Sequence, residues 1–244
     1  MTNQPHPTSQ PPIDNVSQLQ LSPQSQLNGF EWWRRSLSYQ TGLGLSPQEK
    51  AQYEYDYQNR SLDSKCKSCE ENLKWVLNYS PSVIFMMNHI TKLQKQHEPI
   101  NTSKYIKCQT CDFSKGGGFD PNFGIVLCSN WIRSKWQLED ILTHELIHLY
   151  DFMKFNINYN NLRHHACTEI RASMLSGECR IWSEIKKTGL GQFGKKFQNC
   201  IKRRAILSVS ANPVCKNKEE AENVVNIVWK SCFNDTRPFE RIYR

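Results

Sequence analysis

The segment Thr-His-Glu-Leu-Ile-His at residues 143–148 carries most of the information in this sequence. Its flanks are apolar, so we predict a buried helix from Leu138 to about Phe155. On a helix, His144 and His148 lie on one face, about 6 Å apart along the axis. Two imidazoles at this spacing can bind one zinc ion. The alternative is a polar network in the core, because buried polar groups require partners.

Glu145 follows the first histidine on the same side of the predicted helix. From there it can reach a water molecule at the metal without displacing it. Zinc lowers the pKa of such a water towards about 7, and a carboxylate can then accept its proton during attack on a peptide carbonyl. The pattern therefore predicts a zinc peptidase with Glu145 as general base, which later returns the proton to the leaving amine.

A zinc site also needs a third protein ligand. We predict Glu169, which lies on the next helix, expected over residues 162–187 with Gly177 as a weak point. Small residues beside it would let the two helices approach closely, and these are Ala172, Ser173 and Ser176. The alternative is that Glu169 pairs with Arg171 or Arg163 at the surface.

The other candidates for third ligand are Asp151, His164, His165 and Glu178. Asp151 shares a face with the two histidines, but it lies a turn further along, so we expect it to support a ligand histidine. Asp151 becomes the rival ligand if the helix breaks after His148. For His164 we predict a catalytic role, either stabilising the oxyanion or orienting Glu169.

A short buried strand is predicted at residues 124–128 (Gly-Ile-Val-Leu-Cys), ahead of the motif helix. In zinc peptidases of this architecture an edge strand commonly lies beside the metal. We expect residues 124–128 to be that strand and to bind the substrate as an added strand.

Ten cysteines are spread from Cys66 to Cys232. An even number of this size favours disulfides and an oxidising compartment. The alternative is a four-thiolate structural zinc site formed by Cys66, Cys69, Cys108 and Cys111.

Composition separates a tail from a domain. Residues 1–45 form a Gln/Pro/Ser-rich tail that we expect to be disordered, ending in an aromatic-basic segment with Trp32, Trp33, Arg34 and Arg35. It has neither an apolar secretory stretch nor an Arg-rich presequence. Residues 46–244 should form one α+β domain that is zincin-like, mostly helical with a small sheet, and disulfide-stabilised. The net charge of +8 favours anionic partners or simply solubility.

The sequence resembles the family of mitochondrial inner-membrane metalloproteases that process and help assemble the ATP synthase. The resemblance rests on residues 143–151, on the run Arg-His-His-Ala-Cys-Thr-Glu-Ile-Arg-Ala at 163–172, on Leu-Ser-Gly-Glu-Cys at 175–179, and on the two Cys-x-x-Cys pairs with the Gly-Gly-Phe-Asp segment. It extends from about Cys66 to the C-terminus.

This resemblance implies a location in the intermembrane space, peripheral binding to the inner-membrane surface, and import without a cleaved presequence through the oxidative import machinery. It also implies removal of the leader of the ATP synthase subunit 6 precursor and a role in assembly of that subunit. The cofactor would be Zn²⁺, and no nucleic acid partner is expected.

Two alternatives have other functions. One is an assembly chaperone on a zincin scaffold, for which proteolysis is dispensable. The other is a nuclear protease that combines the motif with a zinc ribbon, although such cysteine pairs would usually follow the catalytic helix.

Overall fold

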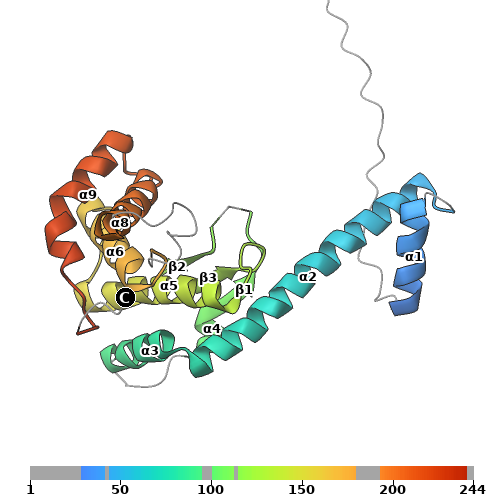
Figure 1. Cartoon of the computed structure of the whole chain (residues 1–244), viewed down its shortest axis with the longest axis horizontal. Helices are drawn as coiled ribbons and strands as arrows, with labels where there is room; N and C mark the ends of the chain where they lie inside the picture. Colours follow the sequence, from blue (N-terminus) through green and yellow to red (C-terminus); the bar gives the residue numbers. More distant parts are fainter. Residues whose placement is uncertain (1–28, 42–43, 95–100, 113–114, 180–192, 241–244) are drawn as a thin grey trace, which may run out of the picture. The chain divides into compact units, whose positions relative to one another are not determined.

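A computed structural model of the chain describes residues 29–41, 44–94, 101–112, 115–179 and 193–240 (Figure 1). The chain divides into two compact units, Met1–Ser61 and Leu62–Arg244. Most of the predicted tail, residues 1–28, lies outside the described residues, and a domain boundary at residues 45/46 stays a prediction.

The first unit contains helix α1 (Gly29–Thr41) and the beginning of helix α2 (Pro47–Tyr79). Trp32 of the aromatic-basic segment stacks on Tyr53 of α2 with ring centroids 5.1 Å apart. Arg35 adds an ion pair of 3.1 Å with Asp56. This part of the predicted tail is therefore a helix packed on α2, and α2 itself continues without a break into the second unit.

The second unit is mostly helical and has one small sheet, which confirms the predicted α+β class (Figure 1). Helix α5 is its centre, because it packs against α3, α6 and two of the three strands. The further elements are α3 (Pro81–Leu93), α4 (Thr102–Tyr105), β1 (Ile106–Gln109), β2 (Gly117–Asp120), β3 (Gly124–Cys128), α5 (Lys135–Phe155), α6 (Leu162–Leu175), α8 (Phe193–Ser210) and α9 (Lys218–Phe233).

The sheet has the order β1-β3-β2, with β1 parallel and β2 antiparallel to β3. The strand at 124–128 is therefore the central one, and the prediction that it forms the substrate-binding edge is wrong. Its burial on both faces reflects this central position. The edge beside α5 belongs to β2, which has no second strand partner among the described residues.

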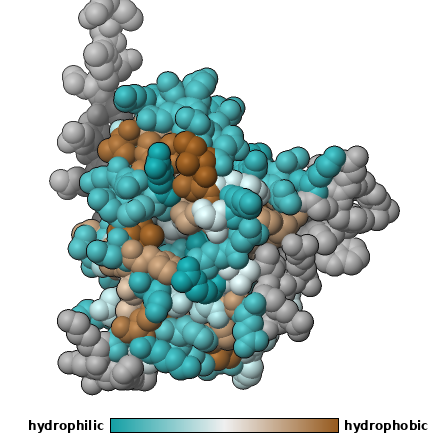
Figure 2. Space-filling model, turned by 90° about the vertical axis from the view of Figure 1, so that its left-hand side faces the viewer, coloured by the Kyte–Doolittle hydropathy of each residue, from teal (hydrophilic) through white to brown (hydrophobic). Residues whose placement is uncertain are grey.

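Two apolar cores hold the second unit together. One lies between α3, α5 and the sheet and includes Val83, Leu127 and Leu142. The other joins α6, α8 and α9 around Ile170 and Ile201. On the face shown in Figure 2, apolar side chains form separate patches among hydrophilic ones. Within the described part of the chain, no helix has the length and apolarity needed to span a bilayer.

Four disulfides cross-link the second unit: Cys69–Cys108, Cys111–Cys128, Cys167–Cys232 and Cys179–Cys200. The first two bonds pair Cys69 with Cys108 and Cys111 with Cys128, and Cys66 is free, so a four-thiolate zinc site at the Cys-x-x-Cys pairs is contradicted. The predicted disulfide framework is confirmed, and it joins α2 to β1, and α6 to α9.

We expect a denatured, unreduced sample to show two reactive thiols, because Cys66 and Cys215 are the free cysteines. After reduction the count should rise to the ten cysteines of the sequence. Titration with a chromogenic thiol reagent, before and after reduction, measures both numbers. A count near ten before reduction would contradict the disulfide framework.

Candidate metal centre

The site is formed by α5 and α6, which are joined by a short polar turn. Asn156 ends α5 in the left-handed conformation (φ 51°), which asparagine tolerates better than most residues. The side chain of Asn161 accepts a hydrogen bond of 3.0 Å from the backbone N–H of Arg163 and caps α6. α6 ends at Leu175, earlier than predicted, and Gly177 follows with a positive φ of 98°. The two helices are thus neighbours, with His144 and His148 facing Glu169.

Three potential ligand atoms converge between these helices. Nε2 of His144 lies 3.0 Å from Nε2 of His148. The Glu169 carboxylate lies 3.7 Å from the first of these nitrogens and 3.5 Å from the second. All three side chains are buried, and one ligand atom from each lies within 4.8 Å of the others. Two imidazole nitrogens and a carboxylate oxygen are a donor set that suits zinc, so the residues present fit a metal ion.

Two of these side chains are held by direct outer partners. Nδ1 of His144 lies 3.0 Å from Oε2 of Glu178, which also pairs with Arg204 of α8 at 2.6 Å. Oε1 of Glu169 accepts a hydrogen bond of 2.7 Å from the hydroxyl of Ser208, also on α8. Such partners orient metal ligands and select the tautomer of a histidine. Helix α8, which begins 45 residues after His148, therefore supports the centre from a distant part of the chain.

His165 is a further outer partner of Glu169. Its Nε2 lies 3.4 Å from the Glu169 carboxylate. Its Nδ1 lies 2.9 Å from the side-chain amide nitrogen of Asn212, which can only donate. Nδ1 therefore accepts, and the ring proton sits on Nε2, where it points at Glu169.

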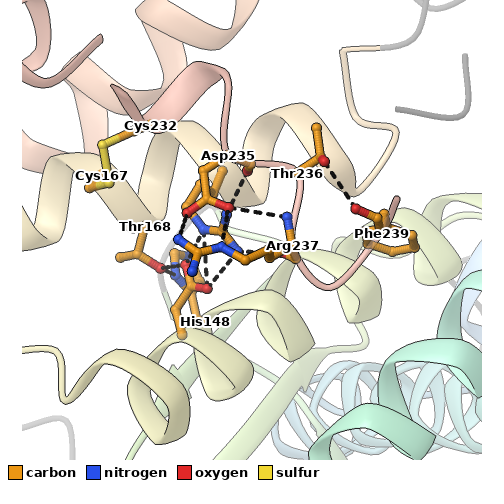
Figure 3. A network of polar contacts seen from close by, with 10 residues as sticks. His148, Cys167, Thr168, Cys232, Asp235, Thr236, Arg237 and Phe239 are labelled. Atoms are coloured by element: carbon orange, nitrogen blue, oxygen red, sulfur yellow. Dashed lines mark hydrogen bonds and ion pairs between the residues drawn. A yellow bond between two sulfur atoms is a disulfide. The ribbon is translucent and has the colours of Figure 1, made fainter. Parts of the chain in front are cut away.

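His148 is held indirectly (Figure 3). Its Nδ1 lies 2.9 Å from the hydroxyl of Thr168, and that hydroxyl donates a hydrogen bond of 2.9 Å to Asp151. Asp151 in turn forms a buried ion pair of 2.9 Å with Arg171. Helix α5 continues unbroken to Phe155, so Asp151 stays a turn beyond the ligand cluster and supports His148 instead of joining it.

Three glutamates, Glu145, Glu169 and Glu178, lie around the two histidines in this centre. Although burial lowers the pKa of His144, Glu178 and the other carboxylates raise it to about 9. Burial raises the pKa of Glu145 to about 7, and Glu169 and Glu178 add to this while His144 opposes it. Burial lowers the pKa of His148 to about 4, so this ring is neutral at pH 7. A divalent cation would relieve the repulsion among the three glutamates.

The cluster opens onto a pocket of about 550 Å³. Glu145 lines it together with His144, His148 and Glu169, and Lys115 and Arg203 contribute basic groups. Residues 116–119, which include the first three residues of strand β2, also line the pocket. The pocket therefore combines the ligand cluster, a buried carboxylate and an open strand edge.

Glycines allow β2 to lie against the motif helix. A Cβ atom at Gly116 would lie 2.4 Å from Cδ1 of Ile141, and one at Gly117 would lie 2.8 Å from the carbonyl oxygen of Val126. Both distances are too short for real Cβ atoms. A side chain at Gly116 would collide with Ile141 of α5, and one at Gly117 would collide with the backbone of β3 and crowd Ile141, so this close packing requires glycine.

The structure does not bring His164 into the pocket. This side chain is exposed, and its Nδ1 accepts a long hydrogen bond of 3.3 Å from the backbone N–H of Asn158. Its neighbour His165 is buried and lines the pocket, as does Tyr159. The expected contribution of His164 to the oxyanion or to Glu169 has no geometric support, because successive residues on a helix point about 100° apart. The sequence feature that could have identified His165 is its position four residues before Glu169, which places both side chains on one face of the helix.

Residues 67–240 match the model of the peptidase M76 family. The chain is 72% identical over 233 residues to the mitochondrial inner membrane protease ATP23 of Candida albicans, covering 96% of this chain and 98% of the relative. The protein of the same name from Lodderomyces elongisporus is 72% identical, over 100% of this chain and 99% of the relative. The protein of the same name from Saccharomyces cerevisiae is 52% identical, over 88% of this chain and 96% of the relative. No solved structure matches the chain.

Proposed function

Because the chain belongs to the peptidase M76 family and is thus a metallopeptidase, we propose that it is a zinc endopeptidase with His144, His148 and Glu169 as metal ligands. The observation that carries this proposal is the convergence of the three ligand atoms within 4.8 Å, beside the pocket that Glu145 lines. The arrangement of ligands on two packed helices also supports the zincin-like architecture expected from the sequence.

A zinc ion held there would supply Lewis acidity, which makes water more acidic and polarises a carbonyl group. Glu145 would accept the proton of the attacking water and return it to the leaving amine. Burial raises the pKa of Glu145 to about 7, which makes this carboxylate a stronger base than a solvated glutamate and supports its role as the base. Glu178 and Thr168 would keep the Nδ1 protons of His144 and His148 in place, which leaves each Nε2 free to bind the metal.

The substrate would add as a strand to the open edge of β2. Backbone groups on an unpaired edge can bind an extended peptide of almost any sequence, and pockets for side chains then give selectivity. Gly118 supports this role. A Cβ built there meets nothing within 4 Å, so the space beside this residue is open, and the absence of a side chain lets a peptide approach the strand closely. The substrate-binding strand expected from the sequence is thereby moved from β3 to β2.

The named relatives are mitochondrial inner membrane proteases, and the proposed location of this chain is the intermembrane face of that membrane. Four disulfides support an oxidising compartment reached through oxidative import. The proposed substrate is the subunit 6 precursor of the ATP synthase, whose leader the enzyme would remove. Help with assembly of that subunit would be a second activity of the same protein.

The experiment that tests this proposal joins metal analysis to cleavage. The oxidised full-length protein is expected to contain about one zinc per chain and to cleave a peptide that spans the N-terminus of subunit 6. Elemental analysis and mass spectrometry of the products measure the two results. Zinc without cleavage would shift the function to assembly, and a folded protein that takes up no zinc would overturn the metal site.

A further inference from the structure

We propose that the segment after α9, residues 235–237, positions the metal ligand His148 through a buried chain of Arg171, Asp151 and Thr168 (Figure 3). This inference rests on the proposed metal site. It assigns a role in metal binding to a part of the chain that lies about 90 residues beyond the motif and does not line the pocket.

The first step is the state of His148. The hydroxyl of Thr168 has one proton, which it donates to Asp151 over 2.9 Å. Its lone pairs must therefore accept the proton of His148 Nδ1, which lies 2.9 Å away. A neutral imidazole with its proton on Nδ1 has a free lone pair on Nε2, the atom that faces His144 and Glu169. Thr168 thus selects the tautomer that can bind the metal.

The second step is the orientation of Asp151. Nε and the terminal nitrogen Nη2 of Arg171 donate to the two oxygens of Asp151, over 3.0 Å and 2.9 Å. With Thr168 as a third donor, Asp151 has the surroundings of an ionised carboxylate that can only accept. A carboxylate in this state requires Thr168 to point its proton away from His148. Arg171 therefore sets the direction in which the hydrogen bonds are donated, from His148 to Thr168 and from Thr168 to Asp151.

The third step is the support of Arg171, which is only 2% exposed and would be costly to bury without partners. Asp235 supplies its carboxylate at 2.7 Å and its backbone carbonyl at 2.5 Å to Nη1. The carbonyl oxygen of Arg237 accepts a further hydrogen bond from Nη2. The remaining hydrogen-bond and ion-pair partners of this guanidinium therefore come from the segment after α9, and its Cζ atom also lies over the Phe155 ring.

The segment is anchored on both sides of this contact. The disulfide Cys167–Cys232 ties the end of α9 to the residue before Thr168. Beyond it, Phe239 stacks on Phe85 of α3 with ring centroids 4.7 Å apart. The position of Asp235 relative to Thr168 is thus defined by a covalent bond and by core packing, which is what a positioning device needs.

The test compares Thr168→Val with Thr168→Ser in the full-length, oxidised protein. Valine keeps the volume but removes the hydroxyl, whereas serine keeps the hydroxyl and leaves a small cavity. Loss of an outer partner commonly lowers metal affinity by about 10–100-fold. We expect that loss for valine and near-wild-type affinity for serine, measured by competition with a zinc chelator. The visible spectrum of the Co²⁺-loaded protein should change for valine alone.

A second pair of variants tests Asp235, at the far end of this series of hydrogen bonds and ion pairs. Asp235→Asn removes the carboxylate from Arg171, and Glu222→Gln removes an exposed carboxylate on α9 that pairs with Lys218 as the matched control. Zinc affinity should fall for Asp235→Asn and stay unchanged for Glu222→Gln. Wild-type affinity in Thr168→Val, or in Asp235→Asn, would overturn the proposal. Failure of the wild type itself to bind zinc would instead overturn the metal site.

Discussion

Replacing Glu145 by glutamine is expected to lower kcat/KM for peptide cleavage by roughly 10³-fold, within the range of about 10²–10⁴ that a general acid–base group contributes. Glutamine has nearly the same size and cannot accept the proton. Glu145 is only 7% exposed and is no member of the ligand cluster, so the zinc content should stay at the wild-type level. Steady-state kinetics on one peptide, with elemental analysis of the same preparations, measures both effects.

Glu139→Gln is the matched control for this variant. Glu139 is also a buried glutamate on α5, but it accepts hydrogen bonds from Ser80 and Ser82 of the α3 region, at 2.6 Å and 3.3 Å, and does not line the pocket. Its replacement should change the free energy of unfolding and leave turnover intact. A Glu145→Gln enzyme that kept more than a tenth of wild-type activity would remove Glu145 from the role of base.

The local parts of this site follow from sequence because they depend on one helix and one turn. The spacing of His144 and His148 places both rings on one face of any regular helix. The asparagines after α5 predict a turn that folds the next helix back. Ala172, Ser173 and Ser176, all fully buried in the structure, predict the close approach that brings Glu169 to the histidines.

The remaining parts depend on which segments become neighbours across long separations. The order of the strands cannot be read from the hydropathy of residues 124–128, because a central strand and an edge strand covered by a helix can both be apolar. The Cys-x-x-Cys spacing is compatible with zinc as well as with disulfides, and only the tertiary fold separates Cys69 and Cys111 into different bonds. The roles of Glu178, Ser208 and Arg171 likewise require α8 and α9 to be in place.

The choice between His164 and His165 follows from their spacing to Glu169. Both histidines follow the same turn, but only His165 lies four residues before Glu169, which places the two side chains on one helix face. The side chain of His164 points about 100° away from that of His165. Asn161 caps α6 ahead of both histidines, and His165 is the one buried beside Glu169.

Replacing Glu169 by glutamine is expected to lower zinc affinity by about 10²–10³-fold and to abolish cleavage at limiting zinc. Zinc bound by four ligands is held by about 10–16 kcal/mol, which is about 3 kcal/mol for each ligand. Glutamine keeps the length of the side chain and can still accept the hydrogen bond from Ser208, so the variant removes the charge more than the packing. Chelator competition measures the affinity, and thermal unfolding of the metal-free proteins shows whether the fold is retained.

Glu178→Gln is the informative comparison, because Glu178 is the other carboxylate that faces His144 in the pocket. It contacts Nδ1 of that ring, on the far side from the Nε2 atom that faces Glu169. As an outer partner it should contribute about 10–100-fold to affinity, less than a ligand. A larger loss of zinc affinity for Glu178→Gln than for Glu169→Gln would make Glu178 the metal ligand and Glu169 the outer partner. It would also require His144 to rotate its ring, because a side chain cannot present Nδ1 to the metal while Nε2 points at His148.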